Sequence, residues 1–174
     1  MSLILGIDPG LAHTGWGIID AQEGRYRLVD HGVITTDSQD APGRRLSRLY
    51  DEIRALLGER APVEAGVESL YFAKNASSAI PVAQARGVVL LALERAGVPA
   101  EEYTPQAIKQ AIVGQGRAEK SQVQELLRVL LGLSAIPEPD HAADALAAAI
   151  CHVHHSGHYA GTRFDAGTAG RRTG

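Results

Sequence analysis

Three carboxylates lie at or near the ends of predicted strands and helices. Asp8 ends the apolar run LILGID, Glu68 ends the predicted strand VEAGVE, and Asp144 lies one turn inside a predicted helix. His141 precedes Asp144 by three residues, so both side chains would share one face of that helix. If the helix packs across the ends of the two strands, three carboxylates and one imidazole converge on one point.

Converging carboxylates raise one another's pKa unless a cation lies between them. Sites rich in oxygen ligands suit Mg²⁺ or Mn²⁺. Two such ions about 3.5–4 Å apart activate water and stabilise the leaving oxygen in phosphodiester hydrolysis. The pattern therefore gives the hypothesis of a site that holds two divalent ions and hydrolyses a nucleic-acid backbone.

Three of these residues also have an ordinary structural explanation. Asp8 stands before a Pro-Gly pair that is typical of a turn. Glu68 also fits an exposed strand end, and His141 fits a surface histidine in a first helical turn. Asp140 is better explained as a helix N-cap than as a metal ligand. Spacing alone therefore gives the metal site weak support.

Length and composition limit the kind of protein that could carry such a site. The chain has 174 residues, 45% of them hydrophobic, which suits one domain with a substantial core. The N-terminus does not resemble a signal peptide and no apolar stretch could cross a bilayer, so we expect a cytoplasmic protein without membrane contact. The net charge of −3 argues against bulk coating of nucleic acid but allows a local basic patch. The single cysteine, Cys151, is predicted to be inert core.

Apolar periodicity predicts the elements that would position the site. Three turn-linked strands at 3–8, 14–20 and 26–36 indicate an antiparallel meander. Alternating helices and strands follow, with helices predicted at 42–59, 76–96, 118–131 and 141–154, another helix that begins at Pro105 in TPQAIKQAIVG, and strands at 63–69 and 100–103. We therefore expect an α/β domain over residues 1–155, with a mixed five-stranded sheet and helices on both faces. Residues 156–174 are rich in glycine and predict a disordered tail.

The segments that hold these residues resemble motifs of the RuvC family, the bacterial Holliday junction resolvases. Four segments carry the resemblance in the family's order: LGIDPGLAHTGWGII, VESLYFAKNASSAIPVAQARGV, AIKQAIVGQGRAEKSQVQ and DHAADALAAAI. The resemblance extends from Leu3 to about His154. It implies an RNase H-like fold and a homodimer that resolves four-way DNA junctions by paired symmetric nicks, in recombination and repair. It also implies partnership with the branch-migration proteins RuvA and RuvB.

The resemblance also implies roles for individual residues. Asp8, Glu68 and Asp144 match the family's catalytic carboxylates, which bind the metal. His141 falls where many members have an aspartate, and a neutral nitrogen ligand should favour Mn²⁺ somewhat over Mg²⁺. An imidazole must be deprotonated to bind a metal, so activity should fall as the pH drops into the range where histidines become protonated.

Basic and aromatic residues near Glu68 are the candidates for DNA contact. Tyr71 matches the aromatic residue that the family inserts against bases, whereas its neighbour Phe72 fits either DNA contact or core packing. Lysine occurs only three times, and Lys109 and Lys120 match basic positions that flank the family's active site. We expect Lys120 to take part in catalysis by stabilising charge on the cleaved phosphate. The remaining DNA-contact candidates are Lys74, Asn75 and Arg117.

Two expectations concern packing. The glycines at positions 10, 15 and 17 are expected to leave space for the approaching DNA backbone. The predicted helix at 76–96 is apolar on most sides, so it needs cover from the core of its own chain or from a partner subunit.

Three other functions fit parts of the sequence. The opening GIDPGLAHTGWGI also resembles the phosphate-binding hairpin of sugar kinases and actin-like ATPases, but 174 residues leave no room for their second lobe. A pre-rRNA-processing nuclease of the YqgF type would lack the VESLYFAKN pattern. A silent junction-binding module would keep the basic and aromatic residues without needing the acidic set, and His141 alone favours it.

Overall fold

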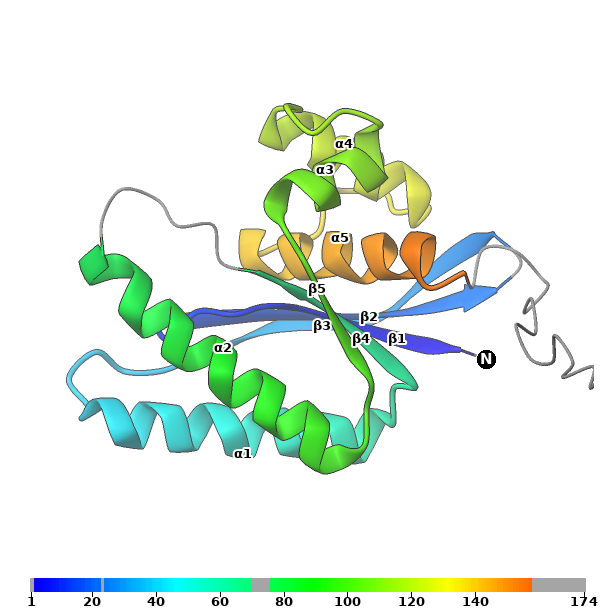
Figure 1. The fold of residues 1–174 in the computed structure, drawn as a ribbon. Coiled ribbons are helices and arrows are strands. Elements are labelled where there is room, and N and C mark those ends of the chain that lie inside the picture. The colour runs from blue at the N-terminus through cyan, green and yellow to red at the C-terminus, as the bar shows by residue number, and fades with distance from the viewer. Residues whose placement is uncertain (1, 23, 70–75, 158–174) are drawn as a thin grey trace, which may run out of the picture.

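A mixed five-stranded sheet forms the centre of the molecule (Figure 1). The computed structural model describes residues 2–22, 24–69 and 76–157. The strands lie in the order β3-β2-β1-β4-β5, where β1, β2 and β3 are antiparallel neighbours and β4 and β5 run parallel to β1. Their bounds are β1 (Leu3–Asp8), β2 (His13–Gln22), β3 (Arg25–Thr35), β4 (Glu64–Glu68) and β5 (Ala100–Tyr103). The predicted meander and mixed sheet are confirmed.

Helices cover both faces of the sheet, as predicted (Figure 1). One face carries α1 (Pro42–Arg60) and α2 (Ala76–Ala96), and the other carries α5 (Asp140–His155) with α3 (Pro105–Val113) and α4 (Lys120–Leu130) packed beyond it. The predicted start of α3 is confirmed, since the Thr104 side chain accepts a hydrogen bond from the Ala107 amide and Pro105 is the first helical residue. Within the described part of the chain, no helix has the length and hydropathy that a membrane span requires.

Large aliphatic side chains fill the space between the sheet and helices α1 and α2. The sheet contributes Leu5, Ile7, Ile18 and Val67, and the two helices contribute Leu49, Ile53, Val89 and Leu93. All of these residues are almost completely inaccessible to solvent. The helical spacing of the apolar residues in α1 follows from the single face that it buries.

The opposite face of the sheet is lined by glycine. Gly17, Gly6 and Gly66 lie in register on the adjacent strands β2, β1 and β4, and we call these three residues the glycine row. A Cβ atom at Gly6 would collide with the backbone carbonyl of Ala145, and one at Gly66 would lie 2.6 Å from the carbonyl oxygen of Ala148. Helix α5 presents mainly alanine, with Ala142, Ala145, Ala148 and Ala149 fully buried. The backbone of α5 therefore rests directly on the backbone of the sheet.

This close packing corrects the prediction that three glycines make room for DNA. A Cβ atom at Gly15 would collide with the carbonyl of His141, and one at Gly17 would lie 2.5 Å from the side chain of Leu146. In the turn between β1 and β2, a Cβ atom at Gly10 would collide with the carbonyl of His13. These glycines make room for other parts of the protein.

A buried chain of polar contacts ties the C-terminal half of α5 to the sheet. His152 is only 3% exposed, with Nδ1 3.0 Å from the Tyr103 hydroxyl and Nε2 2.9 Å from a Glu64 carboxylate oxygen. The neighbouring Cys151 is fully buried, and burial raises the pKa of its thiol to about 12. The expectation that Cys151 is a core residue is confirmed.

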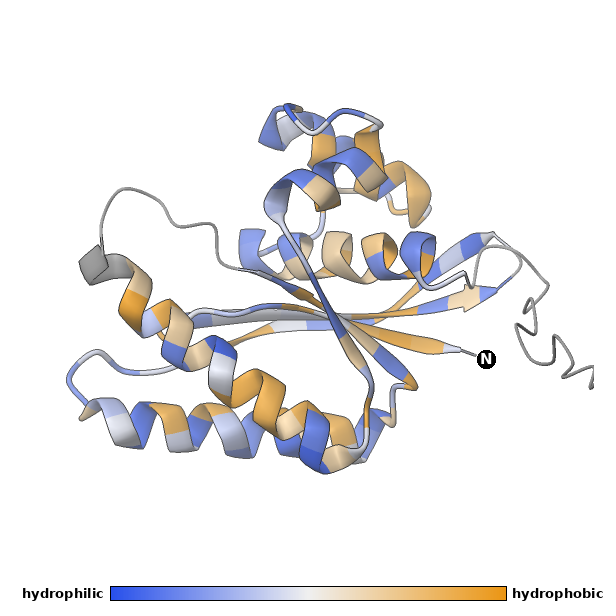
Figure 2. Cartoon of the chain, viewed as in Figure 1, coloured by the Kyte–Doolittle hydropathy of each residue, from blue (hydrophilic) through white to orange (hydrophobic). Residues whose placement is uncertain are grey.

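Helix α2 is covered on one side only. It carries apolar residues around most of its circumference (Figure 2). Val89 and Leu93 are buried against the core, whereas Ile80 is 60% exposed and Leu91 is 52% exposed. Residues 158–174 lie outside the described part of the chain, so the predicted boundary of the domain and its tail stays a prediction.

Candidate metal centre

The strands below α5 place two carboxylates at one edge of the sheet. Residues two apart on a strand share a face, so Asp8 follows Gly6, and Glu68 follows Gly66, on the face that α5 covers. Gly6 and Gly66 are paired on parallel neighbouring strands, which brings the two carboxylates to adjacent positions. Gly15 is paired with Asp8 from the other side and leaves space for the first turn of α5.

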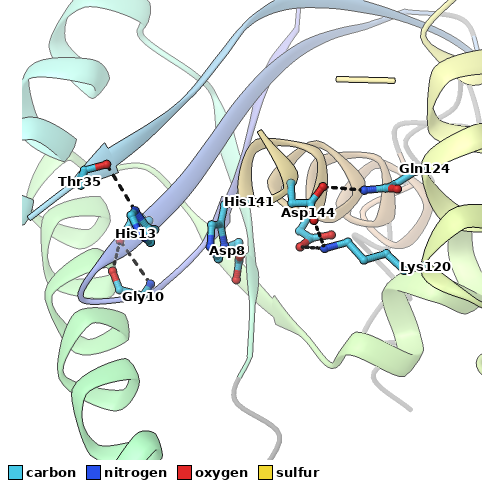
Figure 3. Close-up of polar contacts among 10 residues, drawn as sticks. Asp8, Gly10, His13, Thr35, Lys120, Gln124, His141 and Asp144 are labelled. Atoms are coloured by element: carbon cyan, nitrogen blue, oxygen red, sulfur yellow. Dashed lines mark hydrogen bonds and ion pairs between the residues drawn. The ribbon is translucent and has the colours of Figure 1, made fainter. Parts of the chain in front are cut away.

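The first two turns of α5 complete the cluster. His141 Nδ1 lies 3.0 Å from Asp8 Oδ2, and Asp144 lies on the same side of the helix (Figure 3). One possible ligand atom from each of Asp8, His141 and Asp144 lies within 4.8 Å of the other two. The predicted convergence of these three side chains is therefore present, whereas their role as ligands stays a proposal.

Glu68 lies at the side of this cluster, in a pocket that also contains Asp144. Apolar side chains from α3, α4 and α5 line the pocket together with both lysines: Pro105, Ile108, Lys109, Lys120, Val123 and Ala147. Burial, together with the negative charges of Asp8 and Asp144, raises the pKa of Glu68 to about 8, against the opposing effect of Lys120 and Lys109. Burial also raises the pKa of Asp8, although its hydrogen bond with His141 opposes the rise. Burial therefore disfavours the negative charge of these carboxylates, and a bound cation would compensate that charge.

Lys120 supplies a positive charge next to the cluster. It is the first residue of α4, and its Nζ lies 3.4 Å from Asp144 Oδ2 and 3.1 Å from Asp140 Oδ2 (Figure 3). Partial burial lowers the pKa of Lys120, but pairing with the two aspartates outweighs burial and raises it overall. The ammonium group is therefore charged at neutral pH and compensates part of the acidic cluster.

The prediction that Asp140 caps α5 is wrong. Pro139 occupies the N-cap position, and Asp140 is the first helical residue, without a capping hydrogen bond. The Asp140 carboxylate instead accepts a hydrogen bond from Gln124 Nε2 at 3.0 Å and pairs with Lys120. Both partners belong to α4, so Asp140 connects two helices.

The predicted DNA contacts have different outcomes. Lys109 is half-buried on α3 and lines the pocket that contains Glu68. Arg117 is exposed in the turn between α3 and α4 and does not line that pocket. Four other candidates lie outside the described residues: Tyr71, Phe72, Lys74 and Asn75.

His13 is a neighbour of the cluster that sequence reasoning missed. Its ring stacks on that of His141, with centroids 5.5 Å apart and planes 25° apart. Its Nδ1 lies 3.4 Å from the Thr35 hydroxyl (Figure 3). The spacing offers one signal, because His13 shares a strand face with Gly15 and Gly17, which both contact α5.

Comparison with known proteins identifies the family of the chain. Residues 4–152 match the family described as crossover junction endodeoxyribonuclease RuvC. The chain belongs to the RuvC family. It is 53% identical over 147 residues to RuvC of Treponema denticola, a match covering 84% of this chain and 83% of that protein. It is 54% identical over 150 residues to RuvC of Rubrobacter xylanophilus, with 86% and 84% covered.

A solved RuvC structure extends the match to the fold. Thermus thermophilus RuvC in complex with Holliday junction substrate has a TM-score of 0.81 and 33% sequence identity, and the match covers 90% of this chain and 95% of that one. The predicted RNase H-like fold is confirmed. The RuvC match spans nearly the whole described domain, so the sugar-kinase, rRNA-processing and silent-binding alternatives are set aside.

The donor set agrees with the metal dependence of RuvC nucleases. Two carboxylates and one imidazole offer oxygen and nitrogen ligands that suit Mg²⁺ or Mn²⁺. The cluster is half-buried, so an ion could enter from solvent without unfolding the helix. The side chains present therefore fit a divalent cation.

Proposed function

We propose that this RuvC protein resolves four-way DNA junctions by paired symmetric nicks, through divalent-metal-dependent hydrolysis of phosphodiester bonds. The observation that carries the proposal is the convergence of Asp8, His141 and Asp144 within 4.8 Å, in a chain that belongs to a family of junction endonucleases. The T. thermophilus relative, whose solved structure contains a Holliday junction, supports this choice of substrate.

The acidic cluster would hold the catalytic ions. Asp8, Glu68, His141 and Asp144 together offer enough ligands for two ions of Mg²⁺ or Mn²⁺, with His141 favouring Mn²⁺. Such ions activate the attacking water and stabilise the leaving oxygen. The chain's own contribution is to hold the ligands on two strands and one helix, so that their positions are set before DNA binds.

Lys120 would act on the phosphate. In the metal-free protein its ammonium group pairs with Asp144 and Asp140. Asp144 would share its charge with a bound cation, and the Lys120 ammonium group would then stabilise charge on the scissile phosphate. Lys109 lines the same pocket and would bind a neighbouring phosphate.

Helix α2 would form the dimer. Its outward side combines the exposed apolar residues Ile80 and Leu91 with Ala83 and Gly87, which are also exposed. These positions recur at helical spacing, so they form one stripe that a second copy of the helix could cover. A four-way junction has approximate two-fold symmetry, and a C₂ dimer would present two sites related in the same way.

Family membership supports the cellular setting. RuvA and RuvB, the branch-migration proteins, would deliver junctions to this nuclease. Because four-way junctions arise in chromosomal DNA, the proposed activity would take place in the cytoplasm of a bacterium.

Cleavage of a synthetic four-way junction tests the proposal. With strands labelled separately, Mg²⁺ or Mn²⁺ should produce nicks at symmetric positions in two strands of like polarity, and EDTA should prevent them. Asp8→Asn keeps the shape of the side chain and removes its charge, so cleavage should fall by at least about 100-fold while DNA binding persists. Near wild-type cleavage by Asp8→Asn would show that the proposed ligand role is wrong.

Two further variants separate the proposed roles. Lys120→Ala should lower the cleavage rate more than junction affinity, and equal losses in both would make Lys120 a docking residue only. Leu91→Arg places a charge in the outward stripe of α2, so it should give monomers in sedimentation velocity. A Leu91→Arg protein that still sediments as a dimer would move the interface elsewhere.

A further inference from the structure

His13 contacts the candidate metal centre without belonging to the donor set. It is exposed at the start of β2, and its ring lies parallel to within 25° of the His141 ring at a centroid distance of 5.5 Å. This distance and angle are typical of an offset stack between two aromatic rings. His13 therefore covers one face of the imidazole that the proposed function makes a metal ligand.

An imidazole ligand needs more orientation than a carboxylate. A carboxylate offers two equivalent oxygens, whereas an imidazole presents its lone pair along one direction in the ring plane, and the χ2 torsion of histidine is broad. The His141 side chain is 46% exposed, so core packing does not fix its ring. Two contacts restrict that ring, namely Asp8 at Nδ1 and His13 on one face.

His13 itself is held by a well-defined turn. The Thr14 hydroxyl donates a hydrogen bond to the Gly10 carbonyl at 2.6 Å and accepts one from the Gly10 amide at 3.3 Å. Backbone pairing places His13 opposite Thr35 on β3, and the two side chains are 3.4 Å apart. His13 therefore stands at the end of a turn that is closed by the buried Thr14 hydroxyl.

We infer that His13 is a positioning residue, which holds the plane of the His141 ring by stacking and so prepares His141 to bind a divalent cation. The inference rests on the proposed metal role of His141 and adds a residue that binds no metal itself. The chemistry required of position 13 is a flat aromatic surface, and its ring nitrogens are dispensable.

Binding of Mn²⁺ to the full chain without DNA tests this role. Titration calorimetry would compare wild type with His13→Ala and His13→Phe, each also in a His141→Asp background. Removal of the stack by His13→Ala should weaken Mn²⁺ binding by about 3–10-fold, in line with the contribution of an aromatic pair. His13→Phe keeps a flat ring and should restore affinity to within about twofold of wild type. In the His141→Asp background, His13→Ala should change nothing, because a carboxylate needs no stacking partner.

Each contrary result has a distinct meaning. Wild-type affinity in His13→Ala, with Mn²⁺ binding lost in Asp8→Asn, would overturn the inference and leave the proposed function intact. An equal loss in His13→Ala and His13→Phe would show that a ring nitrogen acts, which also overturns it. If His13→Ala weakens Mn²⁺ binding equally in the wild-type and His141→Asp backgrounds, His13 does not act through the His141 ring, which overturns the inference. If the wild-type chain does not bind Mn²⁺ at all, the proposed metal site is wrong and the inference that depends on it is overturned.

Discussion

The two faces of the sheet are packed in different ways. Against α1 and α2, the contact is made by side chains of leucine, isoleucine and valine. Against α5, glycines of the sheet meet a helix rich in alanine, so backbone contacts backbone at Gly6, Gly15 and Gly66, and Leu146 packs on Gly17. Large side chains can repack around a change, whereas two backbones in contact cannot approach or separate without moving whole elements.

The candidate metal centre belongs to the face with backbone contact. Asp8 and Glu68 are the last residues of β1 and β4, two positions after Gly6 and Gly66 of the glycine row. His141 and Asp144 belong to α5, the helix that packs on this row. Metal ligands must be placed to within about 0.5 Å. The aliphatic face supplies burial, and the glycine face supplies the spacing that the ligands need.

Gly6→Ala should have the largest effect, because Gly6 is the central residue of the glycine row and contacts the backbone of α5. The added methyl group would collide with the Ala145 carbonyl, so α5 must move or the chain must unfold. We expect a loss of more than about 4 kcal/mol in the free energy of unfolding, measured in urea, together with loss of Mn²⁺ binding. A stable Gly6→Ala protein with wild-type Mn²⁺ affinity would contradict the importance of backbone contact.

Ile53→Ala tests the opposite face. Ile53 is fully buried between α1 and the sheet, and its truncation should cost about 2–5 kcal/mol through lost burial and a cavity. Mn²⁺ affinity of the folded protein should stay within twofold of wild type. If affinity falls in proportion to stability, the two faces are not separate in function.

Gly15→Ala should act on the site more than on the fold. Its methyl group would collide with the His141 carbonyl at the very start of α5, so the first turn should shift while the rest of the helix stays in place. We expect Mn²⁺ affinity to fall by about 10–100-fold in a calorimetric titration. Gly58→Ala is the matched control, since nothing lies within 4 Å of a Cβ there, and helix propensity predicts a gain of about 0.5–1 kcal/mol.

Glu68→Gln should show a smaller effect that depends on pH. The pKa of Glu68 rises from 4.5 to about 8 in the folded, metal-free protein, so the folded state binds more protons than the unfolded state between these values. Stability must then fall as the pH rises through this range, and the loss is complete above pH 8. In EDTA, Glu68→Gln should be more stable than wild type by about 1–2 kcal/mol at pH 8.5, with little difference at pH 4.5. Thermal unfolding at both pH values checks this, and an equal difference at both would contradict it.

Local patterns in the sequence predicted the elements and the principal cluster. Strand β1, strand β5 and helix α2 have the predicted bounds, because apolar periodicity and flanking Pro or Gly are local signals. Asp8 and Glu68 could be placed at one edge because parallel strands end together, and His141 and Asp144 because helical spacing puts them on one face. The Glu68 pocket, by contrast, depends on how α3 and α4 pack.

Three features could not be predicted because they depend on distances between elements. The glycines indicated that space is needed, but only the angle of α5 across the sheet identifies what fills it. Asp140 has the residue type of a cap, yet its partners Lys120 and Gln124 come from another helix. His13 meets His141 because α5 begins over β2, and the shared strand face of His13, Gly15 and Gly17 indicates only the side on which His13 lies, not its partner.

The glycine row also limits how this enzyme can be engineered. A designer who wished to widen the cation site for a larger ion would gain little by trimming core residues, because the backbone of α5 contacts the backbone of the sheet at Gly6, Gly15 and Gly66. A longer or shorter ligand, such as glutamate in place of Asp144, would be the only adjustable dimension at that point. Evolution of a new cation preference in this scaffold would then proceed by exchange of ligands such as His141, while the helix stays where it is.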